Sequence, residues 1–180
     1  MQQRNESLIR LRNLVISLAV FAALALYAST YSEPVLRVSV MPGESPPVLR
    51  RKLKPLTDYL EKKIGMKMEF RPMLDDDALV DALISHKLDL VWIDGSSLAR
   101  AETRSNNGVV PLVQRTGNAG HDDYTWTVRS GMDANLRQRL TDAFLALNRD
   151  KAQDKDILDL QRARGFIPAQ AVAHPARPGP

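Results

Sequence analysis

The chain has 180 residues, of which 44% are hydrophobic and 26% charged, and it contains no cysteine. This composition is typical of a globular domain and excludes disordered and collagen-like chains. The absence of cysteine excludes disulfide bonds, thiolate metal sites, a cysteine nucleophile and a lipoprotein anchor. The formal net charge of +4 is too small to indicate binding to nucleic acid or to an anionic membrane surface.

The N-terminal residues 1–32 have the layout of an export signal. Three arginines precede an apolar run of fifteen uncharged residues, 14–28, and small polar residues follow it. This pattern is typical of a secretory signal peptide, and the run is shorter than the ~20 residues that a membrane span needs. An uncleaved N-terminal anchor is the alternative. Either interpretation predicts a periplasmic or extracytoplasmic location, with the membrane contacted only through this segment.

From residue 35 onward, strand-like and helix-like segments alternate. Alternating apolar side chains predict strands at residues 35–41, 67–72, 88–93 and 109–114. Apolar positions repeating at threes and fours predict helices at about 47–64, 75–86 and 95–104. Within the first helix, Pro55 is expected to kink or split the element.

The remaining segments are shorter. A turn-rich break at 116–123 precedes a predicted strand at 124–129, helices at about 133–147 and 154–163, and a tail at 170–180 that is expected to be disordered. Gly165 is expected to cap the last helix. Strands that alternate with helices predict an α/β fold with a parallel or mixed sheet and flanking helices. Residues 33–169 are therefore expected to form one domain.

Two loops are candidates for ligand binding. In an open parallel sheet, ligands bind beyond the carboxyl ends of the strands, where residues 42–46 and 94–97 lead into helices. The first amide groups of a helix lack partners and attract anions. Ser45, Ser96 and Ser97 are therefore candidate anion ligands, and Gly95 would allow close approach of the anion. The alternative is that these serines only cap their own helices.

Other chemistry is expected to be absent. The acidic run at 75–77 lacks the alternating ligands and turn glycine of a calcium loop, so it is expected to complement a helix N-terminus. The three histidines are far apart, and no G-x-S-x-G motif is present. No enzyme, metal or cofactor is predicted. Tyr124 and Trp126 share one strand face, which indicates core packing or, alternatively, a ring that faces a ligand.

Four stretches carry a family resemblance: residues 36–72, 78–115, 123–147 and 157–169. With the GESPP loop around Ser45 and the WIDGSS turn around Gly95, they resemble the phosphate/phosphonate/selenate-type periplasmic substrate-binding proteins of ABC transporters, in particular the subfamily assigned to selenate. The resemblance implies one lobe of a type II periplasmic binding protein plus C-terminal helices. It also implies a small oxyanion as ligand and a permease subunit as partner.

The resemblance has a gap. The family places its second lobe, with a serine- and threonine-rich turn that grips the anion, where this chain has only residues 116–122. We therefore expect a shortened oxyanion-binding component with weakened binding. The alternative is a membrane-tethered interaction or sensory module that is derived from a binding protein and does not transport a ligand.

Overall fold

The structure, a computed structural model, describes residues 16–17, 20, 34–117 and 124–169. The chain divides into a unit at residues 1–34 and a unit at residues 35–180, and the second is described below. The predicted signal or anchor and the predicted tail lie almost entirely outside the described residues. Within the described part, no helix has both the length and the apolar character that a membrane span requires.

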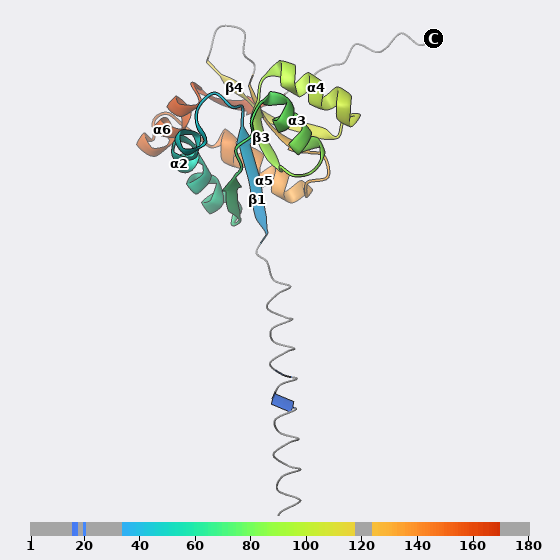
Figure 1. Cartoon of the computed structure of the whole chain (residues 1–180). Coiled ribbons are helices and arrows are strands. Elements are labelled where there is room, and N and C mark those ends of the chain that lie inside the picture. Colours follow the sequence, from blue (N-terminus) through green and yellow to red (C-terminus); the bar gives the residue numbers. More distant parts are fainter. Residues whose placement is uncertain (1–15, 18–19, 21–33, 118–123, 170–180) are drawn as a thin grey trace, which may run out of the picture. The chain divides into compact units, whose positions relative to one another are not determined.

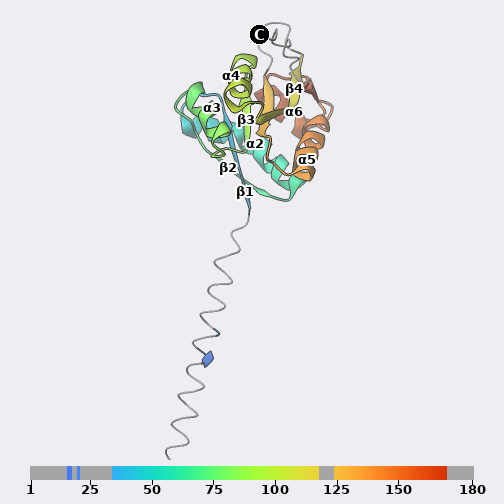
Figure 2. The same cartoon turned by 90° about the vertical axis from the view of Figure 1, so that its right-hand side faces the viewer.

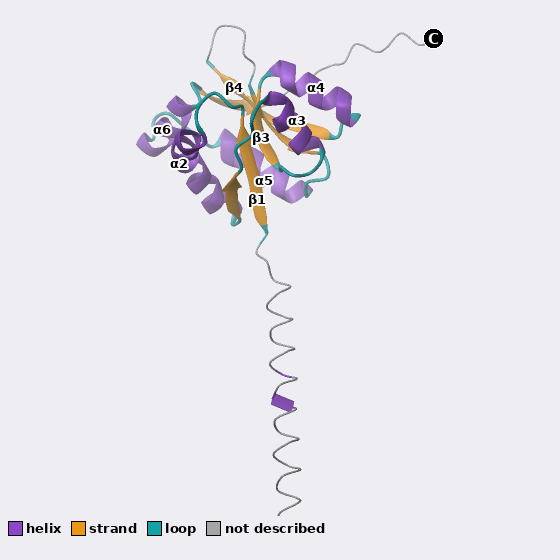
Figure 3. Cartoon of the chain, in the orientation of Figure 1, coloured by secondary structure: helices purple, strands orange, loops and turns teal. Residues whose placement is uncertain are grey.

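Six strands and five helices are described in the second unit (Figures 1 and 3). In chain order they are β1 (Val35–Val40), α2 (Pro46–Ile64), β2 (Lys67–Phe70), α3 (Asp76–Ile84), β3 (Leu90–Ile93), α4 (Gly95–Ser105), β4 (Val109–Thr116), β5 (Thr125–Arg129), α5 (Ala134–Leu145), α6 (Ala152–Leu160) and β6 (Gly165–Pro168). The predicted α/β class with a sheet and flanking helices is confirmed.

The sheet is mixed, with the strand order β2-β1-β3-β5-β4-β6. β1 pairs in parallel with β2 and β3, whereas β5 pairs antiparallel with β3 and β4, and β6 pairs antiparallel with β4. β4 therefore runs in the direction of β1 and β3 but is separated from β3 by β5. The carboxyl ends of β1, β3 and β4 share one edge of the sheet with the starts of β5 and β6.

Helices cover both faces of the sheet (Figure 2). One buried core joins the sheet to α2, α5 and α6, and a second joins it to α3 and α4. The side chains of β3 alternate between these two cores, because successive residues of a strand point to opposite faces of the sheet. Leu90 and Trp92 belong to the first core, and Val91 and Ile93 belong to the second. A strand buried on both faces reads as a continuous apolar run in the sequence.

The sequence predicts that Pro55 kinks or splits its helix, but α2 runs through Pro55 without a break, so the predicted split does not occur. Pro55 lies on the exposed side of the helix. Leu53, Leu56 and Leu60 are buried on either side of it. Packing of this stripe against the sheet holds both halves in one helix despite the missing amide donor.

The C-terminal end differs from the prediction. Gly165 does not cap α6 but begins β6; the helix ends at Leu160, with Gln161 as its C-cap. The residue after the cap, Arg162, has a left-handed backbone with φ of 50°. Its successor Ala163 donates its amide to the carbonyl of Leu158 at 2.9 Å, which closes the helix end in the manner usually provided by glycine.

Opposite the carboxyl ends, a buried carboxylate joins three strands. Asp89, directly before β3, is 3% exposed. Its oxygens accept hydrogen bonds from the Arg37 side chain at 2.7 and 2.9 Å, from the Arg37 amide at 3.0 Å and from Arg129 Nε at 2.9 Å. β1, β3 and β5 are therefore fastened together at this edge.

Candidate functional site

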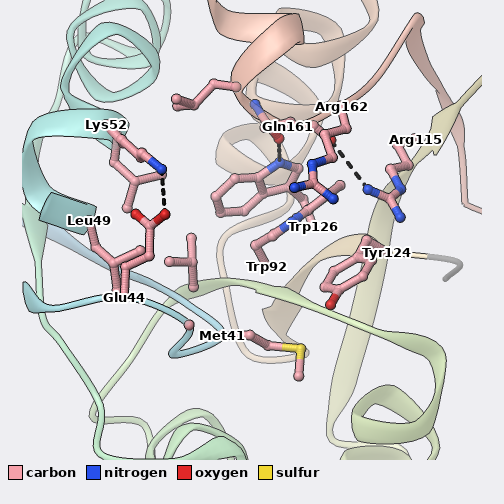
Figure 4. Close-up of a pocket in the computed structure, with 14 residues that line it drawn as sticks. Met41, Glu44, Leu49, Lys52, Trp92, Arg115, Tyr124, Trp126, Gln161 and Arg162 are labelled. Carbon is pink, nitrogen blue, oxygen red and sulfur yellow. Dashed lines mark hydrogen bonds and ion pairs between the residues drawn. The ribbon is translucent and has the colours of Figure 1, made fainter. Parts of the chain in front are cut away.

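A pocket of about 400 Å³ opens at the carboxyl edge of the sheet (Figure 4). It lies between the β1–α2 loop with the start of α2, the ends of β3 and β4, the start of β5, and the end of α6. Its lining residues are Val40, Met41, Gly43, Glu44, Leu49, Lys52, Leu53, Trp92, Arg115, Tyr124, Trp126, Leu160, Gln161 and Arg162. This is the place where the strand directions predict ligand binding.

Aromatic rings form one wall of the pocket. Trp92 stacks on Tyr124 with ring centroids 5.4 Å apart and lies 5.2 Å from Trp126. Trp126 is fully buried and also stacks on Phe144 at 5.3 Å. Trp126 is therefore a core residue, as the core interpretation predicts, while its edge and the half-buried Tyr124 reach the pocket.

Among the described lining residues, the charged side chains are mostly basic: Lys52, Arg115 and Arg162 against Glu44. Lys52 forms an exposed ion pair with Glu44 at 2.5 Å. Arg115 lies over the Tyr124 ring, 4.6 Å from its centroid, and Nη1 donates to the carbonyl of Gln161 at 3.3 Å. Basic side chains beside apolar walls favour an anionic ligand.

Among the described lining residues, Gln161 has the most buried polar side chain, with 7% exposure. Its Oε1 accepts a hydrogen bond from Trp126 Nε1 at 2.7 Å, which Figure 4 shows as a dashed line. Its Nε2 has no hydrogen-bond partner among the described residues. Sequence reasoning missed this residue, since nothing near it in the chain indicates the contact with Trp126.

The predicted ligand residues Ser96 and Ser97 lie at the start of α4. There the carboxylate of Asp94, and neither serine, is the helix cap: it accepts from the Ser97 amide at 2.7 Å and from the Ser96 hydroxyl at 2.9 Å. Ser97 is fully buried, and its hydroxyl accepts from Arg100 at 2.9 Å. Neither serine nor Gly95 is among the lining residues of the pocket.

Ser45 is placed differently. It occupies the N-cap position of α2, but its side chain makes no capping hydrogen bond, and it is exposed. Its neighbours Gly43 and Glu44 line the pocket. The structure therefore brings the Ser45 loop to the pocket and leaves the Gly95–Ser97 turn outside its lining.

The acidic run at 75–77 also has a structural partner. Asp75 caps α3 by accepting from the amide of Ala78 at 2.7 Å. Among the described residues, no group of three histidine or acidic side chains could hold a metal ion.

We predict that Asp94→Ala lowers the free energy of unfolding by about 1 kcal/mol, because the start of α4 loses its cap. Burial disfavours the Asp94 anion, but the hydrogen bonds from Ser97 and Ser96 outweigh this and hold the pKa of Asp94 below its ordinary value. Urea unfolding at pH 7 measures the effect. Asp94→Asn, which keeps an accepting oxygen, should retain most of the stability; equal losses in the two variants would contradict the capping role.

A family comparison decides the relationship. The model of the family described as "ABC transporter, phosphonate, periplasmic substrate-binding protein" matches residues 38–127, half of the chain. The chain belongs to this family. In this member of the phosphonate-binding family, the matched segment runs from β1 into β5. It therefore contains most of the strands whose ends border the pocket.

Individual relatives agree with this membership. The probable ABC transporter phosphite-binding protein PhnD1 of Prochlorococcus marinus (strain MIT 9301) is 28% identical over 97 residues, which are 51% of this chain and 32% of the relative. The chain thus matches about a third of that protein's length. The family and this relative are substrate-binding components and not enzymes, in agreement with the expectation from the sequence.

Solved structures share the fold. The structure of Prochlorococcus marinus PhnD1 in complex with methylphosphonate superposes with a TM-score of 0.66 at 14% identity, covering 76% of this chain and 93% of that chain. A binding-protein component of an ABC phosphonate transporter from Pseudomonas aeruginosa gives 0.69 at 9% identity, covering 77% and 82%. At these identities the likeness concerns the fold alone.

Proposed function

We propose that the chain is an extracytoplasmic substrate-binding component of an ABC transporter and that it binds a small oxyanion of the phosphonate, phosphate or selenate type. The observation that carries this proposal is the pocket at the carboxyl edge of the sheet, whose described lining includes the basic side chains of Lys52, Arg115 and Arg162. Family membership supports the transport role and the location outside the cytoplasm. The alternative of an interaction or sensory module has no comparable support among the relatives.

The ligand contacts belong to the same proposal. Ser45 stands next to the pocket with a hydroxyl that does not cap its helix, so it can turn to an anion. Ser96, Ser97 and Gly95 remain candidates only if the Asp94 carboxylate gives up the amide of Ser97 on binding. The permease subunit of the transporter is the proposed partner, and the N-terminal segment 1–32 is the proposed export signal or anchor.

Shortening is proposed to weaken the binding. Thr116 ends β4 and Thr125 begins β5, and these two strands are antiparallel neighbours. The segment between them is where the family resemblance places a second lobe. An anion held from one side stays partly hydrated, and each hydrogen bond to a charged group that is lost costs about 1.5–3 kcal/mol. Two or three such losses weaken binding by several powers of ten.

Isothermal titration calorimetry of the exported chain at pH 7.5 tests the proposal. The titrants are methylphosphonate, phosphite, phosphate, sulfate, selenate and selenite, with sodium chloride as the control for ionic strength. We expect saturable binding of at least one oxyanion. An absence of binding to every titrant at millimolar concentration would contradict the proposal.

A further inference from the structure

Gln161, at the end of α6, has a side-chain donor that the packing of the helix leaves without an acceptor among the described residues. Gln161 lines the pocket and is 93% buried, and its buried Nε2 has no hydrogen-bond partner among the described residues. A buried donor without a partner costs about 1–3 kcal/mol, so a group of this kind calls for an explanation, and a bound ligand is one. A ligand in the pocket would supply the missing acceptor.

The orientation of this amide is fixed by chemistry. The indole nitrogen of Trp126 can only donate, so the group 2.7 Å from it must be the oxygen of Gln161. Rotating the amide would place two donors against each other. The NH2 group is therefore held on the other side of the amide, where its hydrogens have no acceptor among the described residues.

Arg162, the next residue, also has an unfavourable feature, in this case in its backbone conformation. Arg162 lies in the left-handed region, with φ of 50°, at a helix end where glycine is the usual residue. An L side chain in this conformation is disfavoured by about 1–2 kcal/mol. The side chain of Arg162 lines the pocket, and no carboxylate among the described residues pairs with it. An exposed guanidinium without an acidic partner suits an anionic ligand.

The other end of the pocket is different in character. At α2 the charge of Lys52 is matched by Glu44, with Leu49 beside them (Figure 4). Leu53 also lines the pocket. The volume of about 400 Å³ corresponds to about thirteen water molecules at about 30 Å³ each. A bare oxyanion would leave most of this space to water, whereas an organic group would cover the leucines.

We propose that Gln161 and Arg162 bind the oxyanion head of an organic phosphonate, and that its organic substituent extends along the aromatic wall toward Leu49 and Leu53. This assignment rests on the proposed function and specifies it: the head group lies at the end of α6 and not at the Ser96–Ser97 turn. The expected ligand class is a phosphonate that carries an apolar group of several carbon atoms.

Calorimetry with methylphosphonate and phenylphosphonate at pH 7.5 tests the assignment. Phenylphosphonate is expected to bind the unmodified chain about tenfold or more tightly than methylphosphonate, because the ring removes apolar wall from water. Gln161→Glu keeps an oxygen for Trp126 and replaces the donor with an acceptor, so it should weaken phenylphosphonate binding about 10- to 100-fold. Lowering the pH toward 5 should restore part of this loss relative to the unmodified chain, because the protonated carboxyl can donate.

Arg162→Gly separates binding from folding. It should weaken binding about 10-fold or more while leaving the melting temperature unchanged or raised, because glycine suits the left-handed backbone. Arg162→Lys should retain most of the affinity. His86→Gly is the matched control: His86 has the same backbone conformation, with φ of 62°, is exposed, and does not line the pocket. This control should leave phosphonate binding unchanged.

The outcomes distinguish the two levels of the proposal. Binding of the unmodified chain with unchanged affinity in Gln161→Glu and Arg162→Gly would overturn the head-group assignment and leave the proposed function standing. Equal affinity for the two phosphonates would overturn the ligand class. If the unmodified chain binds no oxyanion, both the proposed function and this assignment fail.

Discussion

Replacing Asp89 with alanine is expected to lower the free energy of unfolding by about 3–5 kcal/mol, because Arg37 and Arg129 lose the buried carboxylate to which both donate hydrogen bonds. The carboxylate is 3% exposed and holds Arg37 of β1 and Arg129 of β5 at the start of β3. Chemical unfolding followed by circular dichroism measures the loss. For a domain of this size, the melting temperature should fall by roughly 10–20 °C.

The control for this prediction is an ion pair of the same type on the surface. Asp58 pairs with Lys54 one helical turn away, and both side chains are about half exposed or more. Asp58→Ala should change the unfolding free energy by less than about 0.5 kcal/mol. Similar losses in the two variants would contradict the view that burial of the Asp89 cluster gives it its strength.

The same cluster sets the response to acid. Burial raises the pKa of Asp89, but the hydrogen bonds from Arg37 and Arg129 outweigh burial and hold it below the ordinary value of 3.8. A carboxyl with a lowered pKa in the folded state stabilises fully above its unfolded pKa and loses this contribution as the pH falls through the folded value. Stability should therefore decline below about pH 4, and less steeply in Asp89→Ala.

Trp126→Ala is expected to cost about 3–5 kcal/mol, as truncation of a fully buried aromatic residue usually does. Its ring stacks on Phe144 and contacts Trp92, so the cavity would lie between the sheet, α5 and the pocket wall. Thermal unfolding measures the loss. Because Trp126 Nε1 also orients Gln161, the variant should bind phosphonates poorly even where it remains folded.

Trp126→Phe separates these two roles. Phenylalanine keeps an aromatic ring in the core and removes the donor, so we expect a loss of about 1–2 kcal/mol, for the most part from the unsatisfied Gln161 oxygen. Phosphonate affinity should still fall, since the amide is no longer held in one orientation. Unchanged affinity in a stably folded Trp126→Phe variant would contradict the orienting role of the indole.

Much of the fold follows from local patterns. The apolar run of β3 and the stripe of α2 predict their elements because burial on these faces depends only on side-chain periodicity. The position of β5 between β3 and β4 is not predictable in this way, since pairing joins residues far apart in the chain. β6 is missed because it is short and contains Pro168. In addition, the left-handed residue that closes the preceding helix is Arg162, whereas the sequence pattern leads one to expect a glycine there.

The candidate site was predictable only in part. The carboxyl edge of the sheet is where the pocket lies, and the Ser45 loop borders it. The role of Asp94 could have been anticipated, because aspartate is a preferred N-cap and directly precedes the helix. Gln161 and Trp126 are 35 residues apart in sequence, and nothing in either segment alone indicates that one orients the other.

The most direct test of the central claim uses the two tryptophans of the chain, both of which line the pocket. In a ¹⁵N-labelled sample each indole N–H gives one NMR signal, and that of Trp126 reports on its bond to Gln161. Titration with phenylphosphonate should shift both signals in a saturable manner, with the same Kd as calorimetry. Calorimetric binding that leaves both indole signals in place would contradict the claim that the anion binds in this pocket.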